Sequence, residues 1–493
     1  MADNTFDVIV IGSGPGGLAC ATLLQKRGVR TLILEKNEVL GGKMYSVDAG
    51  GYAYDLFPHG QVPTRGNAFE QIFAELGCSE DFKPALDVDD QREMITLAYK
   101  RPGWKEYKVT SQKQALTDAT GFFNSWEATP EEQEKSMMLI GEMLSLSAED
   151  LARLDRVTMD EWLSTRDVPA PLYSYLGFQA NASLAEPIDL VSASEMILIM
   201  QQMMLQGGGG QYKGGFAMLT NVMVREFRKN GGTLVNNCRV EKIIVEDGAV
   251  TGVKTAKGTF HAPVVVSNAG LQPTVVKLVG EEHFDKSYVN YVKSLVPGWA
   301  FTSVRYFLNK PVMKTGLYVM WSDDSWYNME RYKEMKEGKI PDEVILFMVS
   351  HKFFDDDAAP EGKQVLVSGT VCSANPEAKE IQALWDKMDE QMQQVFPDIW
   401  EATERKEYTG PKEISDLTRD SVVKGSGGEC VGLAQIVGQC GIDKPKSELP
   451  VRGLYVVGAD AGAAGMGTHQ SGLSGMYATK QIQRYLARLT KAL

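Results

Sequence analysis

A glycine-rich turn near the N-terminus constrains this 493-residue chain more than any other feature of its sequence. An apolar, β-branched run at residues 6–11 leads directly into the sequence GSGPGG at 12–17. The next segment, 18–27, has apolar residues at helical spacing and stops at Gly28, and residues 30–34 form a second apolar run. This order predicts a buried strand, a helix and a second strand, with a GxGxxG turn between the first two.

The glycines of this turn fit a dinucleotide-binding site. Gly12 permits the tight turn, Gly14 lets a pyrophosphate approach the backbone, and Gly17 lets the helix pack closely against the strand. The phosphates are then expected at the helix N-terminus, where free N–H groups and the helix dipole favour anions. Glu35 ends the second strand, where a carboxylate accepts hydrogen bonds from an adenosine ribose. We therefore expect Gly12, Gly14, Gly16, Gly17 and Glu35 to bind a dinucleotide cofactor.

The residues that follow Glu35 narrow the choice of cofactor. They read KNEVLGGK over 36–43, which places a second glycine pair and a lysine after the acidic residue. This spacing resembles the FAD-dependent oxidoreductases that include flavin amine oxidases, phytoene desaturases, carotenoid isomerases and retinol saturases. The resemblance implies that Lys36, Gly42 and Lys43 bind FAD, with Lys43 near the pyrophosphate and ribityl chain, and it favours FAD over NAD.

A second match to the same family lies near the C-terminus. An apolar strand ends at Gly458 and Asp460, a glycine-rich loop follows over 462–472, and a helix begins at Gly472 and Leu473. This stretch resembles the closing FAD motif of the family. The resemblance implies that Asp460 holds a ribityl hydroxyl and that the helix start stabilises negative charge on the flavin.

Two cofactor motifs at opposite ends of the chain predict an α/β fold with a discontinuous Rossmann-type FAD-binding domain. A third family-like stretch begins at residue 207, and in it the resemblance implies that the backbone at Val240 contacts adenine. The rest of the chain is expected to form a mixed α+β substrate domain. The predicted boundaries are 1–85, 207–282 and 426–493 for the FAD-binding domain, and 86–206 and 283–425 for the substrate-binding domain.

Apolar patterns outside the motifs predict further elements. Segment 86–206 is expected to be rich in amphipathic helices, and segment 283–425 to hold strands and a helix that ends before Pro397. The expected strands are 233–240, 242–246, 250–255, 264–267, 300–308, 344–350 and 364–370, and the expected helix is 377–395.

Composition excludes several classes of function. The 51 Lys and Arg against 64 Asp and Glu give a net charge of −13, so we expect no nucleic-acid binding. The six cysteines lack CxxC spacing and the five histidines lack HExxH spacing, so neither a disulfide framework nor a metal site is expected. The first residues do not resemble a signal peptide and no apolar run reaches about 18 residues, so a cytoplasmic protein is expected.

One Met-rich segment, residues 196–205, has three possible roles. It can pack in the core, line an apolar pocket, or make a peripheral contact with a membrane surface. Nothing in the sequence sets the oligomeric state.

Three residues are candidates for catalysis beside the flavin. His59 falls where the family's chain passes the flavin ring, and His469 lies in the C-terminal glycine-rich loop. Tyr212 precedes a glycine pair that borders the expected pocket. Structural roles are the alternative for each. Cys430, in the sequence SGGEC, resembles a cysteine that some amine oxidases bond to the flavin, although non-covalent FAD is favoured.

The sequence favours an FAD-dependent enzyme acting on carbon–carbon bonds of a hydrophobic, polyprenoid-like small molecule. Such an enzyme can be a desaturase, a saturase or a redox-neutral isomerase, because hydride transfer at the flavin serves all three. The alternatives are a flavin oxidase of amines or amino acids and, less favoured, a flavoprotein retained as a binding partner.

Overall fold

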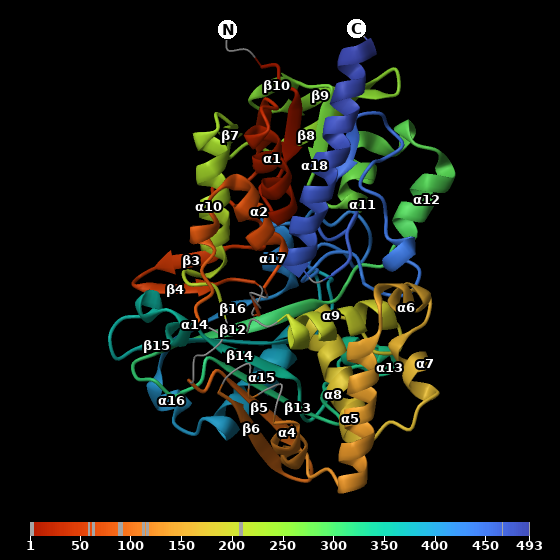
Figure 1. Cartoon of the computed structure of the whole chain (residues 1–493). Coiled ribbons are helices and arrows are strands. Elements are labelled where there is room, and N and C mark those ends of the chain that lie inside the picture. Colours follow the sequence, from red (N-terminus) through yellow and green to blue (C-terminus); the bar gives the residue numbers. More distant parts are fainter. Residues whose placement is uncertain are drawn as a thin grey trace.

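The computed structural model describes residues 4–57, 60–61, 65–86, 92–110, 114, 118–206, 211–465 and 467–492. Two sheet-containing halves lie one above the other (Figure 1). The upper half in that view carries both termini and a parallel sheet, and the lower half carries a larger, mainly antiparallel sheet.

The parallel sheet explains why its strands are so uniformly apolar. Its order is β17 (Leu454–Val456), β11 (Val264–Ser267), β1 (Val8–Ile11), β2 (Thr31–Leu34) and β7 (Thr233–Val235), and all its pairs are parallel. Val8 and Val10 belong to one hydrophobic core, while Ile9 and Ile11 belong to another on the opposite face. Both faces of the sheet are therefore covered, as a doubly wound fold requires.

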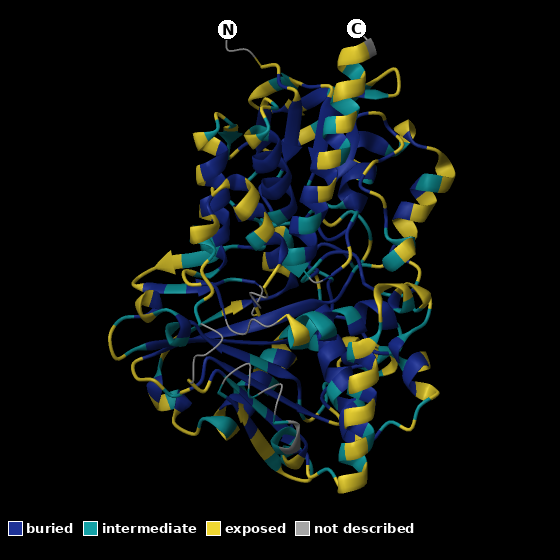
Figure 2. Ribbon diagram, in the orientation of Figure 1, coloured by how far each residue is buried: buried dark blue, intermediate teal, exposed yellow. Residues whose placement is uncertain are grey.

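Helices cover one face of this sheet, and a second small sheet covers part of the other. The helical layer contains α1 (Pro15–Lys26), α2 (Ala68–Leu76), α10 (Gly215–Lys229) and α18 (Gly467–Ala492). The opposite layer contains the antiparallel sheet of β8 (Val240–Glu246), β9 (Ala249–Thr255) and β10 (Gly258–His261), with α11 (Leu271–Pro273), η3 (Thr274–Gly280) and α12 (Lys286–Ser294). The strands β1, β2, β11 and β17 are buried along their whole length, and Figure 2 shows the interior of the upper half as buried.

The lower half is built on a seven-stranded sheet in which only one pair, β13 with β5, is parallel. Its order is β16 (Thr403–Thr409), β12 (Ala300–Leu308), β15 (Gln364–Cys372), β14 (Leu346–Ser350), β13 (Leu317–Ser322), β5 (Ile95–Lys100) and β6 (Trp104–Val109). A hairpin of β3 (Ser46–Ala49) and β4 (Tyr52–Asp55) packs against this sheet through Tyr52 and Phe307.

Two groups of helices pack on opposite faces of the seven-stranded sheet. Met320 and Met348 face one group, whereas Val319 and Phe347 face the other. The first group includes α13 (Met329–Lys336), α15 (Ile381–Val395) and α16 (Ile399–Ala402). The second includes α4 (Ala119–Ser125), α5 (Pro130–Ser145), α6 (Ala148–Arg153), α7 (Met159–Ser164), α8 (Ala170–Gln179), η2 (Ala180–Leu184) and α9 (Ala193–Leu205). Shorter elements are η1 (Ser79–Asp81), η4 (Glu281–His283), α14 (His351–Phe354), η5 (Asp356–Ala358), α17 (Pro411–Leu417) and η6 (Gly441–Asp443).

The structure confirms the predicted α/β class with a parallel sheet assembled from distant segments. The strands of the parallel sheet come from 1–85, 207–282 and 426–493, and those of the seven-stranded sheet come from 86–206 and 283–425. The division into two domains stays a prediction, although the sheets follow its boundaries.

Several predicted elements were wrong in detail. The expected strand 233–240 is broken, because β7 joins β2 in the parallel sheet while β8 pairs with β9. Segment 86–206 contains the strands β5 and β6 besides its helices, and β10, β13 and β16 were not predicted. The glycine-rich loop 462–472 ends earlier than expected, since α18 begins at Gly467.

Glycine allows α18 to lie unusually close to α1. A Cβ at Gly475 would lie 2.4 Å from the carbonyl oxygen of Gly16 and 2.9 Å from the Cβ of Ala19. Gly475→Ala should therefore destabilise the fold by about 1–3 kcal/mol, because overpacking moves one helix. A lowered Tm checks this. Gly141→Ala on α5 is the matched control, since a Cβ there meets open space; equal Tm values for the two variants would contradict the close contact.

Candidate functional site

One cavity of about 740 Å³ is lined by residues of both halves of the molecule. This volume is at the upper end of the range of small-molecule sites, about 300–1,000 Å³. Gly12, Glu35 and Asn268 line it directly after β1, β2 and β11, and Gly458 lines it two residues after β17. Ligands of open α/β sheets bind at these carboxyl ends. The cavity continues into a second, apolar arm against the seven-stranded sheet.

The β1–α1 turn presents backbone to the cavity. Gly12 has φ +89°, and α1 has no side-chain cap, so the polar end of the helix is available to an anion. Gly42 has φ +58°, and a Cβ there would lie 3.1 Å from Cα of Gly14. The two glycine motifs are therefore packed on each other, and Gly12, Gly14 and Gly42 line the cavity.

Gly16 and Gly17 have a different role from the lining glycines. A Cβ at Gly17 would lie 2.3 Å from the carbonyl oxygen of Gly12, and one at Gly16 would lie 2.7 Å from the N atom of Gly458. These positions hold the helix close to the strands, and neither belongs to the described lining of the cavity.

Glu35 and its neighbours form one end of the groove. The Glu35 carboxylate accepts hydrogen bonds from Ser13 N at 2.9 Å, Ser13 Oγ at 2.8 Å and Asn37 N at 2.9 Å. Lys36 and Val240 line the same end. The structure thus brings Glu35 and Val240, which were expected near the adenosine, together with Lys36, which was expected to bind the cofactor.

The predicted C-terminal residues divide into two groups. Gly458 and Asp460 line the cavity next to Asn268 and Gly270, which follow β11. Gly472 instead packs against Ala68, where a Cβ would lie 3.0 Å from the Cβ of that residue, and Leu473 packs on a hydrophobic core. Gly472 and Leu473 are therefore absent from the lining residues that the structure describes.

Three charged lining residues, Arg239, Arg419 and Asp420, were missed by the sequence analysis. Arg419 and Asp420 lie in a short segment at the end of α17, 417–420, which we call the strap. Asp420 contacts three cations: Lys277 Nζ at 2.5 Å, Arg239 Nη1 at 3.1 Å and Lys36 Nζ at 3.6 Å. Burial alone would raise the pKa of Asp420, but these cations lower it to about 2. No sequence motif marks the strap, because its partners lie far away along the chain.

Lys43 and Cys430 lie together on the cavity wall. Lys43 Nζ donates to the carbonyl oxygen of Glu429 and, at 3.4 Å, to that of Val431. Burial raises the pKa of the Cys430 thiol, and the nearby Lys43 only partly opposes this effect. Since the thiolate is the nucleophilic form, the raised pKa does not favour a bond to a cofactor.

The second arm of the cavity is apolar. It lies between Val319 and Phe347 of the seven-stranded sheet and the helices α4, α5, α8 and α9. Its described side chains carry no charge. They include Met94, Ile95, Leu97, Tyr107, Val109, Phe122, Phe123, Met137, Ile140, Leu144, Tyr175, Phe178, Met200, Met203, Met204 and Leu317.

The Met-rich segment 196–205 serves two structural roles. It forms most of α9, whose Met196, Ile197 and Ile199 are buried in a hydrophobic core. Met203 and Met204, one turn further along, line the apolar arm.

His469 lies in the first turn of α18, not in a loop as expected, and lines the cavity. Its Nε2 lies 3.3 Å from the hydroxyl of Tyr212, which accepts a hydrogen bond from Asn67 Nδ2 at 3.2 Å. Burial lowers the pKa of His469 to about 4, so the ring is neutral near pH 7. Tyr212 is 1% exposed and lies behind His469, outside the described lining. His59 lies outside the described residues.

The sequence model of the family of flavin containing amine oxidoreductases matches residues 15–482 of this chain. The chain belongs to this family. Among its relatives, a phytoene desaturase (neurosporene-forming) of Cereibacter sphaeroides is 25% identical, covering 81% of this chain and 79% of its own. A chloroplastic prolycopene isomerase of Daucus carota is 24% identical, covering 97% and 80%. The structure of an oxidoreductase from Methanosarcina mazei has the same fold, with a TM-score of 0.70 at 18% identity over 96% of this chain and all of that one.

Membership makes this chain an oxidoreductase with a flavin cofactor. The groove fits such a cofactor, because an uncapped helix end, paired glycine backbones and unpartnered guanidinium donors all meet in it. The described residues contain no cluster of three His, Cys, Asp or Glu side chains that could hold a metal ion.

The lowered pKa of His469 predicts a pH dependence of stability. From about pH 6.5 down to about pH 4 the unfolded chain binds a proton that the folded chain excludes, so the free energy of unfolding falls across this window. Because the ring is only half-buried, we expect a contribution of about 1–3 kcal/mol. Unfolding curves at several pH values should show a flatter acid decline for His469→Asn; parallel curves would contradict the assignment.

Proposed function

We propose that this chain is an FAD-dependent oxidoreductase acting on carbon–carbon bonds of a hydrophobic, polyprenoid-like substrate. The observation that carries the proposal is the composition of the cavity, which joins a charged nucleotide groove to an arm without charged side chains among its described residues. Desaturases and isomerases of carotenoids among the relatives support the same substrate class.

The apolar arm favours a polyene over an amine. An ammonium group buried in such an arm would need a carboxylate partner, and the carboxylates of the described lining, Glu35, Asp420 and Asp460, all lie in the nucleotide groove. The polar groups of the arm are already paired with each other: Gln179 Nε2 donates to Tyr175 at 2.7 Å, and Ser183 donates to Gln179 Oε1 at 2.9 Å. An extended hydrocarbon needs no further partners.

A bound flavin supplies the hydride chemistry, and the chain's own side chains position the substrate and exclude water. Methionine and aromatic side chains exclude water from the arm. Neutral His469 presents a ring nitrogen to the cavity while Tyr212 and Asn67 hold its Nε2 side. We propose that His469 contacts the substrate or moves a proton to it, with Tyr212 as its positioning residue. His59 stays a second candidate on sequence grounds.

We further propose that FAD binds without a covalent bond. The raised pKa of Cys430 supports this point. Acid precipitation should leave the yellow colour in solution, whereas yellow precipitate would indicate a bond through Cys430.

The substrate class is tested by anaerobic titration of the purified yellow protein while the flavin absorbance is followed. A polyene should bleach the oxidised flavin if the enzyme is a desaturase, or reoxidise the reduced flavin if it is a saturase. Isomerisation by the reduced enzyme without net oxidation would mark an isomerase. Amines should leave the spectrum unchanged; bleaching by an amine, with peroxide released on return to air, would replace this proposal by an amine oxidase.

The rim of the apolar arm offers a route for a lipid-like substrate. Met137 on α5 both lines the arm and is 47% exposed, and the neighbouring Met138 and Leu205 are 70% and 59% exposed. Of the helices in the described ranges, none combines the length and the hydrophobicity of a membrane span. We propose that this rim makes a peripheral contact with neutral lipid, since Glu131 and Glu134 on α5 would repel an anionic surface.

The double variant Met138→Glu/Leu205→Glu tests this contact. Each apolar side chain transferred from water into lipid stabilises binding by about 1.5–3 kcal/mol, so flotation with phosphatidylcholine vesicles should fall at least tenfold. Ile442→Glu is the matched control, because Ile442 is 76% exposed but does not belong to the described lining of the cavity. Equal flotation of the double variant and the control would count against the rim.

A further inference from the structure

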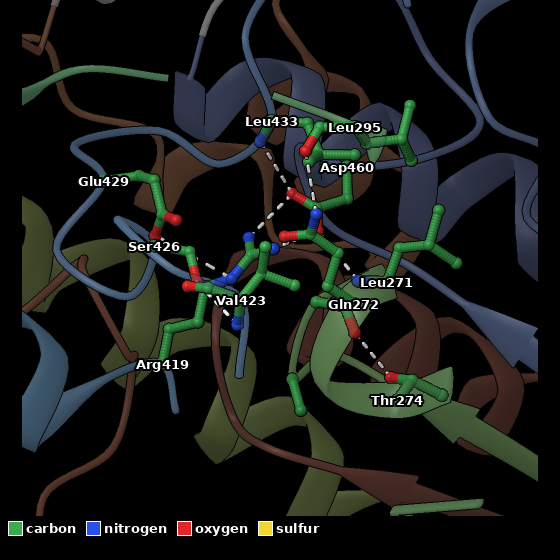
Figure 3. Close-up of polar contacts among 12 residues, drawn as sticks. Leu271, Gln272, Thr274, Leu295, Arg419, Val423, Ser426, Glu429, Leu433 and Asp460 are labelled. Atoms are coloured by element: carbon green, nitrogen blue, oxygen red, sulfur yellow. Dashed lines mark hydrogen bonds and ion pairs between the residues drawn. The ribbon is translucent and has the colours of Figure 1, made fainter. Parts of the chain in front are cut away.

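Arg419 is a buried arginine on the wall of the nucleotide groove. Only 7% of it is exposed, and it reaches from the strap toward Asp460 at the end of β17 (Figure 3). A Cβ at Gly270 would lie 2.8 Å from the guanidinium carbon of Arg419, and Gly270 has φ +94°. Glycine at the end of β11 therefore leaves the space that the guanidinium occupies.

The carboxylate of Asp460 has little capacity left for a ligand. Oδ1 accepts hydrogen bonds from Arg419 Nη1 at 2.9 Å and Leu433 N at 3.0 Å. Oδ2 accepts from Leu271 N at 2.8 Å and lies 2.8 Å from Arg419 Nη2 (Figure 3). A carboxylate has about four acceptor positions, and four donors already surround this one. A ribityl hydroxyl could donate to Asp460 only by displacing one of them.

Arg419 differs from Asp460, because its guanidinium has more hydrogen-bond donors than the surrounding acceptors can engage. Its Nε has no hydrogen-bond partner, because the nearest carboxylate, that of Glu429, lies 3.8 Å away, too far for a hydrogen bond. Nη2 has only the ion-pair contact with Asp460 described above. A guanidinium offers five N–H donors, of which Asp460 engages only one side. Buried donors without partners are costly, so a ligand with acceptor oxygens is the natural complement.

The strap carries Arg419 across the groove and is fixed at its other end. Asn37 Nδ2 donates to the carbonyl oxygen of Leu417 at 2.7 Å, and Asp420 is held by the cations Lys36, Arg239 and Lys277. Asn37, Lys36 and Arg239 belong to the end of the groove near Glu35, while Asp460 belongs to the other end. Arg419 therefore lies where the middle of an extended dinucleotide must pass.

We propose that Arg419 binds the ribityl–diphosphate chain of the cofactor, and that Asp460 acts mainly as the positioning residue of Arg419. This inference rests on the proposed binding of FAD. It reverses the roles expected from the sequence, in which Asp460 contacts a ribityl hydroxyl and Arg419 has no role. The relevant ligand chemistry is a row of phosphate and hydroxyl oxygens that accept hydrogen bonds.

The test is the affinity of the flavin-free full chain for FAD, measured by quenching of flavin fluorescence. Arg419→Met should raise Kd about 10–100-fold, because a hydrogen bond to a charged group is lost. Arg419→Lys should give an intermediate loss, since lysine keeps the charge without the planar fork. Arg305→Met is the matched control: Arg305 is 2% exposed with an unpartnered Nε, but it lies outside the described lining. Its Kd should stay within threefold of wild type.

A double-variant cycle separates the two roles of Asp460. If Asp460 acts through Arg419, Arg419→Met/Asp460→Asn should bind FAD about as weakly as Arg419→Met alone. Additive losses would show that Asp460 binds the cofactor independently and would overturn its positioning role. The double variant also removes both buried charges, so it provides a folded form to test if Arg419→Met does not fold.

Three outcomes distinguish the levels of the proposal. Wild-type chain that fails to bind FAD would refute the proposed cofactor itself. Wild-type binding with Arg419→Met and Arg419→Lys both within threefold would refute the role of Arg419 alone. Weaker binding of FAD by the Arg419 variants is the supporting result, and binding of ADP-ribose and riboflavin then locates the contact. An equal loss of affinity for ADP-ribose would assign the contact to the diphosphate. An equal loss of affinity for riboflavin would assign it to the ribityl hydroxyls.

Discussion

The close approach of α1 and α18 over the end of the parallel sheet is the constraint on which the site depends. Gly16 and Gly17 bring α1 against β1 and β17, and Gly475 brings α18 against α1. A side chain at Gly16 or Gly475 would separate elements that lie more than 400 residues apart in the 493-residue sequence. Because they meet, the first and last segments of the chain form one groove, and His469 of α18 lines the same cavity.

Buried charge is the second organising feature of the groove. Arg419, Asp460, Glu429 and Lys43 form a group of two cations and two carboxylates beside the cavity. Burial alone would raise the pKa of Asp460, but Arg419 and two backbone N–H groups hold it below its usual value. Such a group is costly to assemble and is weak evidence for stability. Its position on the wall of a ligand site, with guanidinium donors unpartnered, gives it a functional explanation.

The sequence predicted the parts of the site that depend on local geometry. A GxGxxG turn and an acidic residue at a strand end carry their own physical reasons, so Gly12, Gly14 and Glu35 could be placed on one groove from the sequence. Gly42 and Asp460 were placed there by the resemblance to the family, and both line the same cavity. The fold class followed from the same motifs, since strand, turn and helix in that order specify a parallel sheet.

The rest could not be predicted, because it depends on contacts between distant segments. Arg419 meets Asp460 across 41 positions, and Asp420 meets Lys36, Arg239 and Lys277 from three different segments. β6 also escaped detection, since its alternation is broken by the adjacent exposed residues Lys105 and Glu106.

The division of one cavity into a charged groove and an uncharged arm limits the range of possible substrates more than any single residue does. Cations and backbone donors gather around Glu35, whereas methionine and aromatic side chains line the other arm of the described cavity. A charged substrate would lose its hydration in that arm without gaining a partner, whereas an extended hydrocarbon would lose only unfavourable contact with water. His469 lies on the same cavity wall and is kept neutral by burial, so it can take part without placing a charge there. The arm therefore selects substrates whose reacting bonds are themselves uncharged, and carbon–carbon bonds of a polyene meet that condition.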